Sequence, residues 1–403
     1  MNKLYLKFTF NRIVSKGLFY ISIKILEKVS MVFIGFILIP VSTILHVLNF
    51  RIVNIFIERI GHLAIEPACV LTEYRHKYKL ILIKSNNVAN NYLLYLWSNE
   101  FIIINSKIVG WILKSMTIYK FALLDCSKYE RVFNIPRLSF KIFSQENNFE
   151  NLNKILENDV QYLHSYLEKL GMKKNDWYVC VHAREEGFSL VDDNVQMHRN
   201  ADIDNYNKAI IYILSLGGWV IRLGDSTMKK SSLVNEKFID YANSNHKSEL
   251  LDVLLCKYAK FILGSSSGIC TLGALFSTPC AISNLMPTGD AWFTKLDIYM
   301  PKKIYNIKEQ RFLTLSEIMT LPVNNFRYAS QYIDHEYLYF ENSSEEIYNL
   351  TIEMLNFINN KFVQSSKQIS VNFSIANFRN LNSNSYYSKA NFCTSFFDQF
   401  FVT

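Results

Sequence analysis

The chain has 403 residues, of which 50% are hydrophobic and 19% are charged. This length exceeds one ordinary domain and suits two domains with tails, and this composition excludes a disordered chain. Seven cysteines are scattered without a CxxC pair, which argues against a disulfide framework or a zinc ribbon and favours reduced thiols in the cytosol. The net charge of +8 comes without a basic–aromatic motif, so we expect no nucleic-acid partner.

The first 51 residues (1–51) are basic and then strongly hydrophobic. Residues 1–28 hold six Lys or Arg and one Glu, and no charged residue occurs from Val29 to Phe50, a run of 22 residues. Because about 20 apolar residues can span a bilayer, we interpret this segment as membrane-associating, with a basic flank that favours anionic lipids. Pro40 would break a helix within the run, which favours shallow insertion; a buried helix of a soluble domain is the alternative.

Residues 52–160 are expected to form a first α/β domain. The block ERIGHLAIEP opens it, and 79–85 and 101–113 have the composition of strands or short buried elements. Apolar residues at helical spacing follow from Val160, and this helix ends at Gly171, a suitable C-cap.

Residues 161–363 alternate strands and helices regularly, which predicts a parallel, doubly wound sheet. Ligands bind such sheets at the carboxyl ends of the strands. The expected strands are 177–183, 219–224, 260–264 and 279–283, and the expected helices are 206–216, 234–244, 248–259 and 269–276. A capping box at Ser343 predicts a last helix that ends near Phe362. The Ser- and Asn-rich tail, 364–403, is expected to be poorly ordered.

Three polar clusters directly follow strands of this second domain: HAREE (182–186), GDS (224–226) and GSSSG (264–268). The carboxyl ends of parallel strands share one edge of a sheet, so the clusters are expected to form one site. Arg184 is the main candidate for phosphate binding, because a guanidinium can hold phosphate with two hydrogen bonds. His182 lies on the same strand face and either orients a ligand or fills the core.

The loop Gly264–Gly268 lies between a strand and a helix. Its backbone N–H groups and the hydroxyls of Ser265, Ser266 and Ser267 would suit a diphosphate at a helix N-terminus, although an ordinary capped loop is the alternative. The loop also matches the GxSxG pattern of hydrolases, but no Ser–His–acid triad can be assigned from the sequence.

Three further side chains are candidates for binding a nucleotide. Asp225 follows a strand and either holds a ribose or base or caps a turn. Asp252 is a lone acid on an apolar helix and, if buried, needs a partner; a solvated helix face is the alternative. Arg222 faces either a charged partner or solvent.

A second group of candidates precedes the helix 206–216. Asn200 and Asp202 either cap this helix, which contains Tyr206, or close over the ligand. Asp202-Ile203-Asp204 also fits the DxD pattern of metal-dependent transferases. Acids are favoured before any helix, so we expect no metal and no cofactor.

Taken together, several blocks resemble a bacterial family of glycosyltransferases related to the fucosyltransferase superfamily. They are RIGHLAIEP, VHAREEGF, RNADIDNY, GGWVIRLGD, DVLLCKYAKFILGSSSG and SSEEIYNLTIEML, and they extend from Arg59 to Phe362. More distantly, HAR, GD and D…GSSSG resemble three motifs of enzymes that use GDP-fucose. The resemblance implies a GT-B fold, with two Rossmann-like doubly wound domains and a cleft between them, and metal-independent transfer.

The resemblance also implies roles for individual residues. It implies Arg184 on the diphosphate, Asp225 and Asp252 near the nucleoside, and Ser266 and Ser267 on the phosphates. The motif of the fucosyltransferases often continues with a second Arg and then an acid, whereas this chain has Glu185-Glu186. One positive charge is lost, which weakens the inference that the donor is GDP-fucose.

Sugar transfer also needs a base that takes a proton from the acceptor hydroxyl. Glu185 and Glu186 directly follow Arg184. His62 is a third candidate, because the preceding Gly61 allows a substrate or backbone to come close. The sequence does not decide between them.

We therefore predict an inverting, metal-independent glycosyltransferase with a nucleotide-diphosphate donor, GDP-fucose-like favoured. It would move a hexosyl or fucosyl group to a glycan or lipid-linked acceptor in surface polysaccharide synthesis. Nucleotide sugars are largely cytosolic, so the expected location is the cytoplasmic face of the plasma (inner) membrane. A non-catalytic, membrane-associated protein that binds a nucleotide or sugar is the alternative, since Glu185-Glu186 would suit a site that has drifted.

Overall fold

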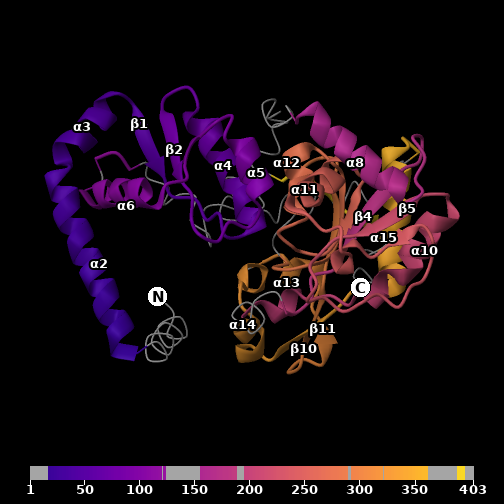
Figure 1. Ribbon diagram of the computed structural model, residues 1–403. Helices are drawn as coiled ribbons and strands as arrows, with labels where there is room; N and C mark the ends of the chain where they lie inside the picture. Colours follow the sequence, from indigo (N-terminus) through magenta and orange to yellow (C-terminus); the bar gives the residue numbers. More distant parts are fainter. Residues whose placement is uncertain are drawn as a thin grey trace. The chain divides into compact units, whose positions relative to one another are not determined.

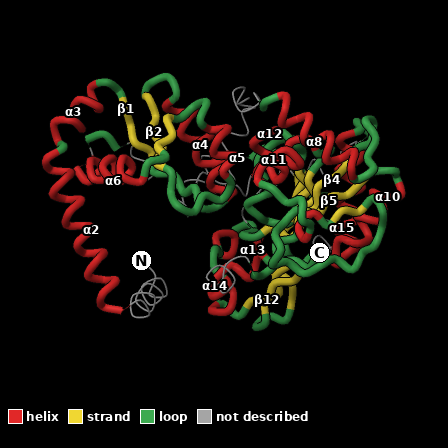
Figure 2. Tube along the Cα trace, in the orientation of Figure 1, coloured by secondary structure: helices red, strands yellow, loops and turns green. Residues whose placement is uncertain are grey.

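The computed structural model of the protein describes most of the chain (Figure 1), and helices, strands and loops are distinguished in Figure 2. The described residues are 17–119, 121–123, 155–187, 195–288, 292–320, 322–361 and 388–394, with side chains from residue 21 onward. They divide into two compact units.

Each unit collects segments that are separated in the sequence. The first unit takes the described residues of Met1–Ile55, Glu73–Asn87 and Glu100–Cys126, and the second takes those of Phe56–Thr72, Val88–Asn99 and Ser127–Thr403. Helix α4 (Ile60–Tyr74) therefore belongs mainly to the second unit, although it connects two strands of the first. The boundaries predicted from the sequence, 52–160 and 161–363, stay a prediction.

A three-stranded parallel sheet in the order β1-β2-β3 forms the centre of the first unit. The strands are β1 (Phe50–Val53), β2 (Lys79–Ile83) and β3 (Ile102–Ile104). Helix α6 (Lys107–Met116) packs tightly on the sheet through Gly110, where a β-carbon would lie 2.7 Å from the Ile83 side chain. Only a glycine permits this approach.

The hydrophobic run of the N-terminal segment forms two helices of the first unit, α2 (Gly17–Ile37) and α3 (Ile39–Val47), as expected. Pro40 lies in the first turn of α3, where its missing N–H removes no intrahelical bond, so the chain starts a new helix there. Among the described residues no single helix is long and apolar enough to cross a membrane. The pair 21–37 and 39–47 reaches that length and hydropathy only when joined, across a bend of 63°.

The second unit contains a seven-stranded sheet in the order β13-β9-β8-β7-β4-β5-β6. Every neighbouring pair of strands is parallel. The strands are β4 (Tyr178–His182), β5 (Trp219–Arg222), β6 (Phe238–Ile239), β7 (Ile262–Gly264), β8 (Cys280–Leu285), β9 (Ile298–Pro301) and β13 (Asn391–Phe392). The central strands are buried along their whole length, as expected for a parallel sheet covered on both faces.

Two groups of helices pack beside this sheet, which lies between them in Figure 1. Helix α10 contacts α15, and α11 contacts α5, α8 and α12. The helices are α5 (Asn91–Trp97), α8 (Glu157–Lys169), α10 (Asn207–Ser215), α11 (Glu249–Tyr258), α12 (Thr271–Phe276) and α15 (Ser344–Ile358). The helix ends follow the expected signals: Ser248 accepts from the Leu251 N–H, and Ser343 forms a capping box with Glu346.

A small antiparallel sheet, β11-β10-β12, accompanies the large one in the second unit. Its strands are β10 (Lys303–Asn306), β11 (Arg311–Phe312) and β12 (Tyr337–Phe340), and two short helices are α13 (Leu315–Ile318) and α14 (Ala329–Asp334). The 3-10 helices of the described chain are Thr117–Tyr119, Met197–Arg199, Ile203–Tyr206, Tyr241–Asn243 and Val323–Asn325.

The helix expected over 234–244 is wrong. Phe238 and Ile239 form strand β6, paired with Val220 and Ile221 of β5, and a 3-10 helix follows. The Asn235 side chain accepts from the Lys237 N–H at 2.9 Å and holds a turn before the strand. Hydrogen bonding of this segment to the edge of β5 thus outweighs its local helical propensity.

The mixed α/β class, the parallel sheets and the N-terminal hydrophobic helices are confirmed. Of the predicted tail, the described part is 388–394, where β13 adds an edge strand to the large sheet. Phe392 packs there against Tyr299 with ring centroids 5.3 Å apart. The remaining residues of the predicted tail lie outside the described chain.

Candidate functional site

Polar residues gather where four neighbouring strands end. Strands β9, β8, β7 and β4 are adjacent and parallel, so their carboxyl ends share one edge. Within two positions of these ends stand Lys302 after β9, Met286 after β8, Ser265 after β7 and Arg184 after β4. The sheet topology therefore brings together residues that lie far apart in sequence, at the edge where parallel sheets bind ligands.

Two hydrogen bonds join the loops after β4 and β7. The Ser265 N–H donates to the His182 carbonyl at 3.0 Å, and the Arg184 N–H donates to the Ser265 hydroxyl oxygen at 2.8 Å. Gly264 permits the contact, because a β-carbon there would lie 2.5 Å from the Cys270 sulfur. The backbone of Arg184 is thus fixed to the GSSSG loop, as the predicted shared site requires.

The middle serine of this loop, Ser266, is only 6% exposed. Its hydroxyl donates to the Met286 carbonyl at 2.8 Å, and no histidine contacts it among the described residues. A hydrolase nucleophile needs an adjacent base, so the arrangement does not support the GxSxG reading of Gly264–Gly268.

His182 and Ser267 form a hydrogen-bonded pair at the same edge. Nε2 of His182 lies 2.9 Å from the Ser267 hydroxyl oxygen, and Nδ1 lies 3.1 Å from the Leu223 carbonyl oxygen. Burial lowers the pKa of His182 to about 4, and Arg222 and Arg184 act in the same direction. His182 is therefore neutral at physiological pH.

The Arg184 side chain, half-buried, reaches across to the segment that follows β4. Its Nη1 group donates to Asn200 Oδ1 and to the Gln196 carbonyl at 3.3 Å. Asn200 also donates to the exposed Glu186 at 3.4 Å. The structure thus brings together three predicted residues, Arg184, Asn200 and Glu186. The Asn200 side chain bonds to both the guanidinium and the carboxylate.

Three further cations surround this place, and the sequence analysis does not single them out. Arg199 donates through Nε (3.1 Å) and Nη2 (2.7 Å) to the Ser266 carbonyl. Lys302 donates to the Asn200 carbonyl at 2.5 Å. Gln196 donates to the Arg327 carbonyl at 3.1 Å, which ties in the segment that carries Arg327. Lys302 follows a strand directly, the signal that selected Arg184, whereas Arg327 carries no such signal.

Buried His198 lies close to these cations. Its side chain is fully enclosed, and its ring packs against Tyr332 with centroids 5.5 Å apart. Burial lowers its pKa to about 3, with Arg199, Lys302, Arg184 and Arg327 acting in the same direction. Within the described chain neither ring nitrogen has a hydrogen-bond partner. We infer an electropositive site that suits an anion.

Lys302 belongs to this electropositive site as well. It is 2% exposed, and burial lowers its pKa to about 8; Arg184 acts in the same direction and Glu341 opposes it. An anion placed here would raise the pKa of Lys302, so anion binding and protonation favour each other.

Arg222, the last residue of β5, is engaged by two acids. Its side chain is fully buried and paired with Glu185 at 3.0 Å and Asp240 at 3.2 Å. Glu185 also accepts from the Lys229 N–H at 2.8 Å. Burial raises the pKa of Glu185, and Arg222 opposes this. The first acid of Glu185-Glu186 is therefore engaged in a buried ion pair.

The other predicted residues have hydrogen-bond or ion-pair partners of their own, and Asp225 is close enough to His182 to oppose the lowering of the histidine pKa. Tyr206 is in the core, with its hydroxyl 2.7 Å from that of Ser283, and burial raises its pKa. Asp225 accepts from the Thr227 N–H at 2.8 Å in a turn. Asp252 is paired with Lys247 at 2.9 Å; burial raises its pKa and Lys247 opposes this.

Asp202 lies at the start of the 3-10 helix Ile203–Tyr206, where its carboxylate accepts from the Asp204 N–H at 3.0 Å. Both acids of the DxD pattern contact Lys229. In the described part of the chain no group of three or more His, Cys, Asp or Glu could hold a metal ion.

His62 reaches the GSSSG loop through its helix. Gly61 and Gly268 touch backbone to backbone: a β-carbon on Gly61 would lie 2.9 Å from the Gly268 Cα atom. His62 follows Gly61, and its Nδ1 lies 2.6 Å from Glu66 Oε1. The other Glu66 oxygen accepts from the Phe56 N–H at 2.8 Å. The carboxylate holds Nδ1 as the donor, and no described residue bonds to Nε2.

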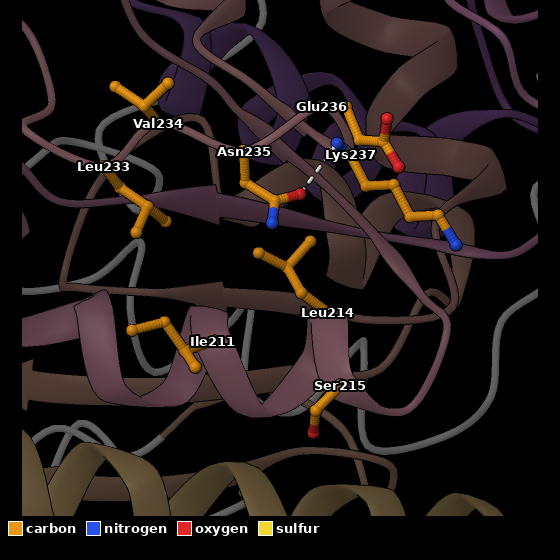
Figure 3. A pocket seen from close by; sticks show the side chains of 8 residues that line it. All are labelled: Ile211, Leu214, Ser215, Leu233, Val234, Asn235, Glu236 and Lys237. Atoms are coloured by element: carbon orange, nitrogen blue, oxygen red, sulfur yellow. Dashed lines mark hydrogen bonds between the residues drawn. The ribbon is translucent and has the colours of Figure 1, made fainter.

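A separate hollow of about 390 Å³ lies between α10 and the segment before β6 (Figure 3). It is lined by Ile211, Leu214, Ser215, Leu233, Val234, Asn235, Glu236 and Lys237. These residues lead into the amino ends of β5 and β6. The hollow is therefore at the opposite edge of the sheet from the cations.

Comparison with known proteins gives only distant likenesses. No protein-family model matches the sequence, and no curated protein matches it. Among solved structures, the chain is similar to the dodecameric iron-containing heptosyltransferase TibC in complex with ADP-D-β-D-heptose. The identity is 12%, over 62% of this chain and 62% of that one, with a TM-score of 0.35.

A second similar structure is the UDP-GlcNAc 2-epimerase of Methanocaldococcus jannaschii in complex with UDP-GlcNAc and UDP. The identity is 13%, over 56% of this chain and 65% of that one, with a TM-score of 0.21. The chain thus spans less than two thirds of either protein. The chemistry of the site rests on this chain's own residues.

The buried ion pairs predict different effects for two arginines of the same region. Arg222→Met should lower the free energy of unfolding by about 3–5 kcal/mol, because it leaves two carboxylates without their buried counter-charge. Arg184→Ala should cost less than about 1 kcal/mol, since that side chain is only half-buried. Urea unfolding followed by circular dichroism measures both, and equal losses would contradict the division between supporting and site residues.

Proposed function

We propose that the protein is a glycosyltransferase that uses a nucleoside diphosphate sugar as its donor. The observation that carries this proposal is the gathering of Arg184, Arg199, Lys302 and Arg327 at the carboxyl edge of a parallel sheet, beside a loop that contacts the His62 helix. A departing diphosphate needs fixed positive charge, and the acceptor hydroxyl needs a base. Both requirements have candidates within the second unit.

In the proposed reaction, the acceptor oxygen attacks the anomeric carbon while the bond from that carbon to the diphosphate breaks. The electron pair of this bond leaves with the diphosphate, where the four cations balance the added negative charge. The acceptor proton passes to Nε2 of a base histidine. Attack opposite the leaving group inverts the anomeric carbon.

His62 is the base we propose. Its Nδ1–H is held by Glu66, which orients the ring and favours the imidazolium that forms. Glu185 is less suited, because both of its oxygens accept hydrogen bonds, from Arg222 and from the Lys229 N–H. Glu186 is exposed and contacts Asn200.

The fucosyltransferase-like motif lacks a second arginine in this chain, because Glu185-Glu186 follows Arg184. The positive charge at the proposed donor site comes instead from three other residues, Arg199, Lys302 and Arg327. A GDP-fucose-like donor therefore stays our proposal, with a glycan or lipid-linked acceptor in surface polysaccharide synthesis and no metal. A non-catalytic nucleotide-binding protein would bind the same donor without turnover.

Arg184→Ala should abolish transfer and weaken nucleotide binding at least about tenfold, the loss expected when a charge-assisted contact of about 1.5–3 kcal/mol is removed. Thermal shifts with GDP, UDP, CDP and dTDP, with and without EDTA, measure binding to the folded state. We expect one diphosphate to stabilise the wild type regardless of EDTA. The role of Arg184 fails if transfer stays within twofold of wild type, and the proposed function fails if none of the four nucleotides binds.

His62→Gln should lower kcat by about 10²–10⁴-fold, the usual contribution of a general base, and leave nucleotide binding close to wild type. Glu66→Gln should reduce kcat less, because a neutral amide still orients the ring but stabilises the imidazolium that forms less than a carboxylate does. Single-turnover kinetics measures both effects. If His62→Gln keeps the wild-type kcat, His62 is not the base, and Glu185 and Glu186 become the candidates.

We further propose that α2 and α3 attach the protein to the cytoplasmic face of the plasma membrane. On these helices the small residues Gly35 and Ser42 face the rest of the unit: Ser42 is 1% exposed, and a β-carbon on Gly35 would clash with the Ser115 carbonyl. The large apolar side chains are exposed instead, including Leu26 (69%), Phe33 (64%) and Phe36 (63%). This inside-out arrangement favours a lipid interface, and the basic residues Lys24 and Lys28 precede Phe33 and Phe36 on α2.

Flotation with phosphatidylcholine vesicles containing phosphatidylglycerol tests this attachment. Wild type should float, whereas a Phe33→Glu and Phe36→Glu double variant should remain in the dense fraction, because each buried aromatic contributes about 1.5–3 kcal/mol. Ile333→Glu, at an exposed site of the second unit (68%), is the matched control. Unchanged flotation of the double variant, or a wild-type chain that self-associates without binding vesicles, would exclude the proposal.

A further inference from the structure

The direction of one hydrogen bond determines what Ser267 can offer a ligand. Nδ1 of His182 lies 3.1 Å from the Leu223 carbonyl oxygen. A carbonyl oxygen only accepts hydrogen bonds, so Nδ1 carries the ring proton. The second nitrogen of a neutral imidazole then has a lone pair and no proton.

His182 is held in this neutral form by its surroundings. It is 4% exposed, and the cations Arg222 and Arg184 oppose a second proton. Its bare Nε2 lies 2.9 Å from the Ser267 hydroxyl oxygen. In this pair the hydroxyl must be the donor, and a hydroxyl has a single proton to give.

Two of the three hydroxyl protons of the GSSSG loop are consequently engaged within the protein. The proton of Ser267 is directed to His182, and that of Ser266 to the Met286 carbonyl. Neither hydroxyl can donate to a phosphate oxygen without giving up a buried partner, which costs about 1–3 kcal/mol. Ser267 is, however, partly exposed at the sheet edge, and its oxygen keeps lone pairs that can accept.

We propose that the Ser267 oxygen accepts a hydrogen bond from a hydroxyl or N–H group of the nucleotide sugar, and so selects the ligand rather than binding its diphosphate. This inference rests on the proposed function. In this proposal the cations bind the diphosphate. The Ser267 oxygen accepts a hydrogen bond from a donor group on the nucleoside or sugar. His182 is the positioning residue that fixes this polarity.

Two ligands separate the two roles of the serine. Methyl diphosphate, just above neutral pH, carries phosphate oxygens but almost no proton to donate, whereas the nucleotide sugar that binds wild type carries both. Isothermal titration compares wild type with Ser267→Ala for each ligand. We expect methyl diphosphate to bind both proteins alike, and the nucleotide sugar to bind the variant about three- to tenfold more weakly, the value of one neutral hydrogen bond.

Ser267→Thr keeps the hydroxyl and should restore most of the nucleotide-sugar affinity. Ser215→Ala, an exposed serine at the opposite sheet edge, is the matched control, and circular dichroism checks that each variant is folded. Weakened methyl diphosphate binding in Ser267→Ala, with or without an effect on the nucleotide sugar, would place Ser267 on the phosphates and overturn the inference. An unchanged affinity for both ligands would also overturn it. Failure of wild type to bind any nucleotide sugar would instead reject the proposed function.

Discussion

The site depends on two hydrogen bonds that fasten the end of β4 to the end of β7. Ser265 donates to the His182 carbonyl and accepts from the Arg184 N–H, so both loops are held in one geometry. Gly264 makes this possible, because any larger residue would collide with Cys270. The position of Arg184, the pairing of His182 with Ser267, and the support of Arg199 by the Ser266 carbonyl all follow from this junction.

The charged residues of the second unit fall into two groups, a fully buried arginine paired with acids and the cations around Arg184. Arg222 is balanced by Glu185 and Asp240. Burial lowers the pKa values of His198 and Lys302; four cations add to the effect on His198, and Arg184 adds to that on Lys302. Burial is the main cause of both shifts and the neighbouring cations add to it, so an anion bound here would offset the mutual repulsion of the cations. This physical reason connects the fold to the proposed diphosphate chemistry.

The backbone contact between Gly61 and Gly268 positions His62, the proposed base, next to the GSSSG loop. Helix α4 is separated by about two hundred residues of sequence from the GSSSG loop, yet the two backbones touch without any side chain between them. His62 and Ser267 flank this contact, one residue away on each chain segment. Sugar transfer requires a base and an anion site close together, and two glycines allow that approach.

The sequence by itself determined the parallel α/β sheet, the helix caps at Ser248 and Ser343, and the position of three polar clusters after strands, because these depend on local periodicity and side-chain chemistry. The tertiary structure decided the rest. It placed the short edge strand β6 and a 3-10 helix within 234–244, where a helix was expected. It also buried Tyr206 and Arg222 in the interior and added Lys302 and Arg327 to the site. These outcomes depend on which distant strands become neighbours, since pairing, burial and the sum of charges are properties of the folded chain that no short segment contains.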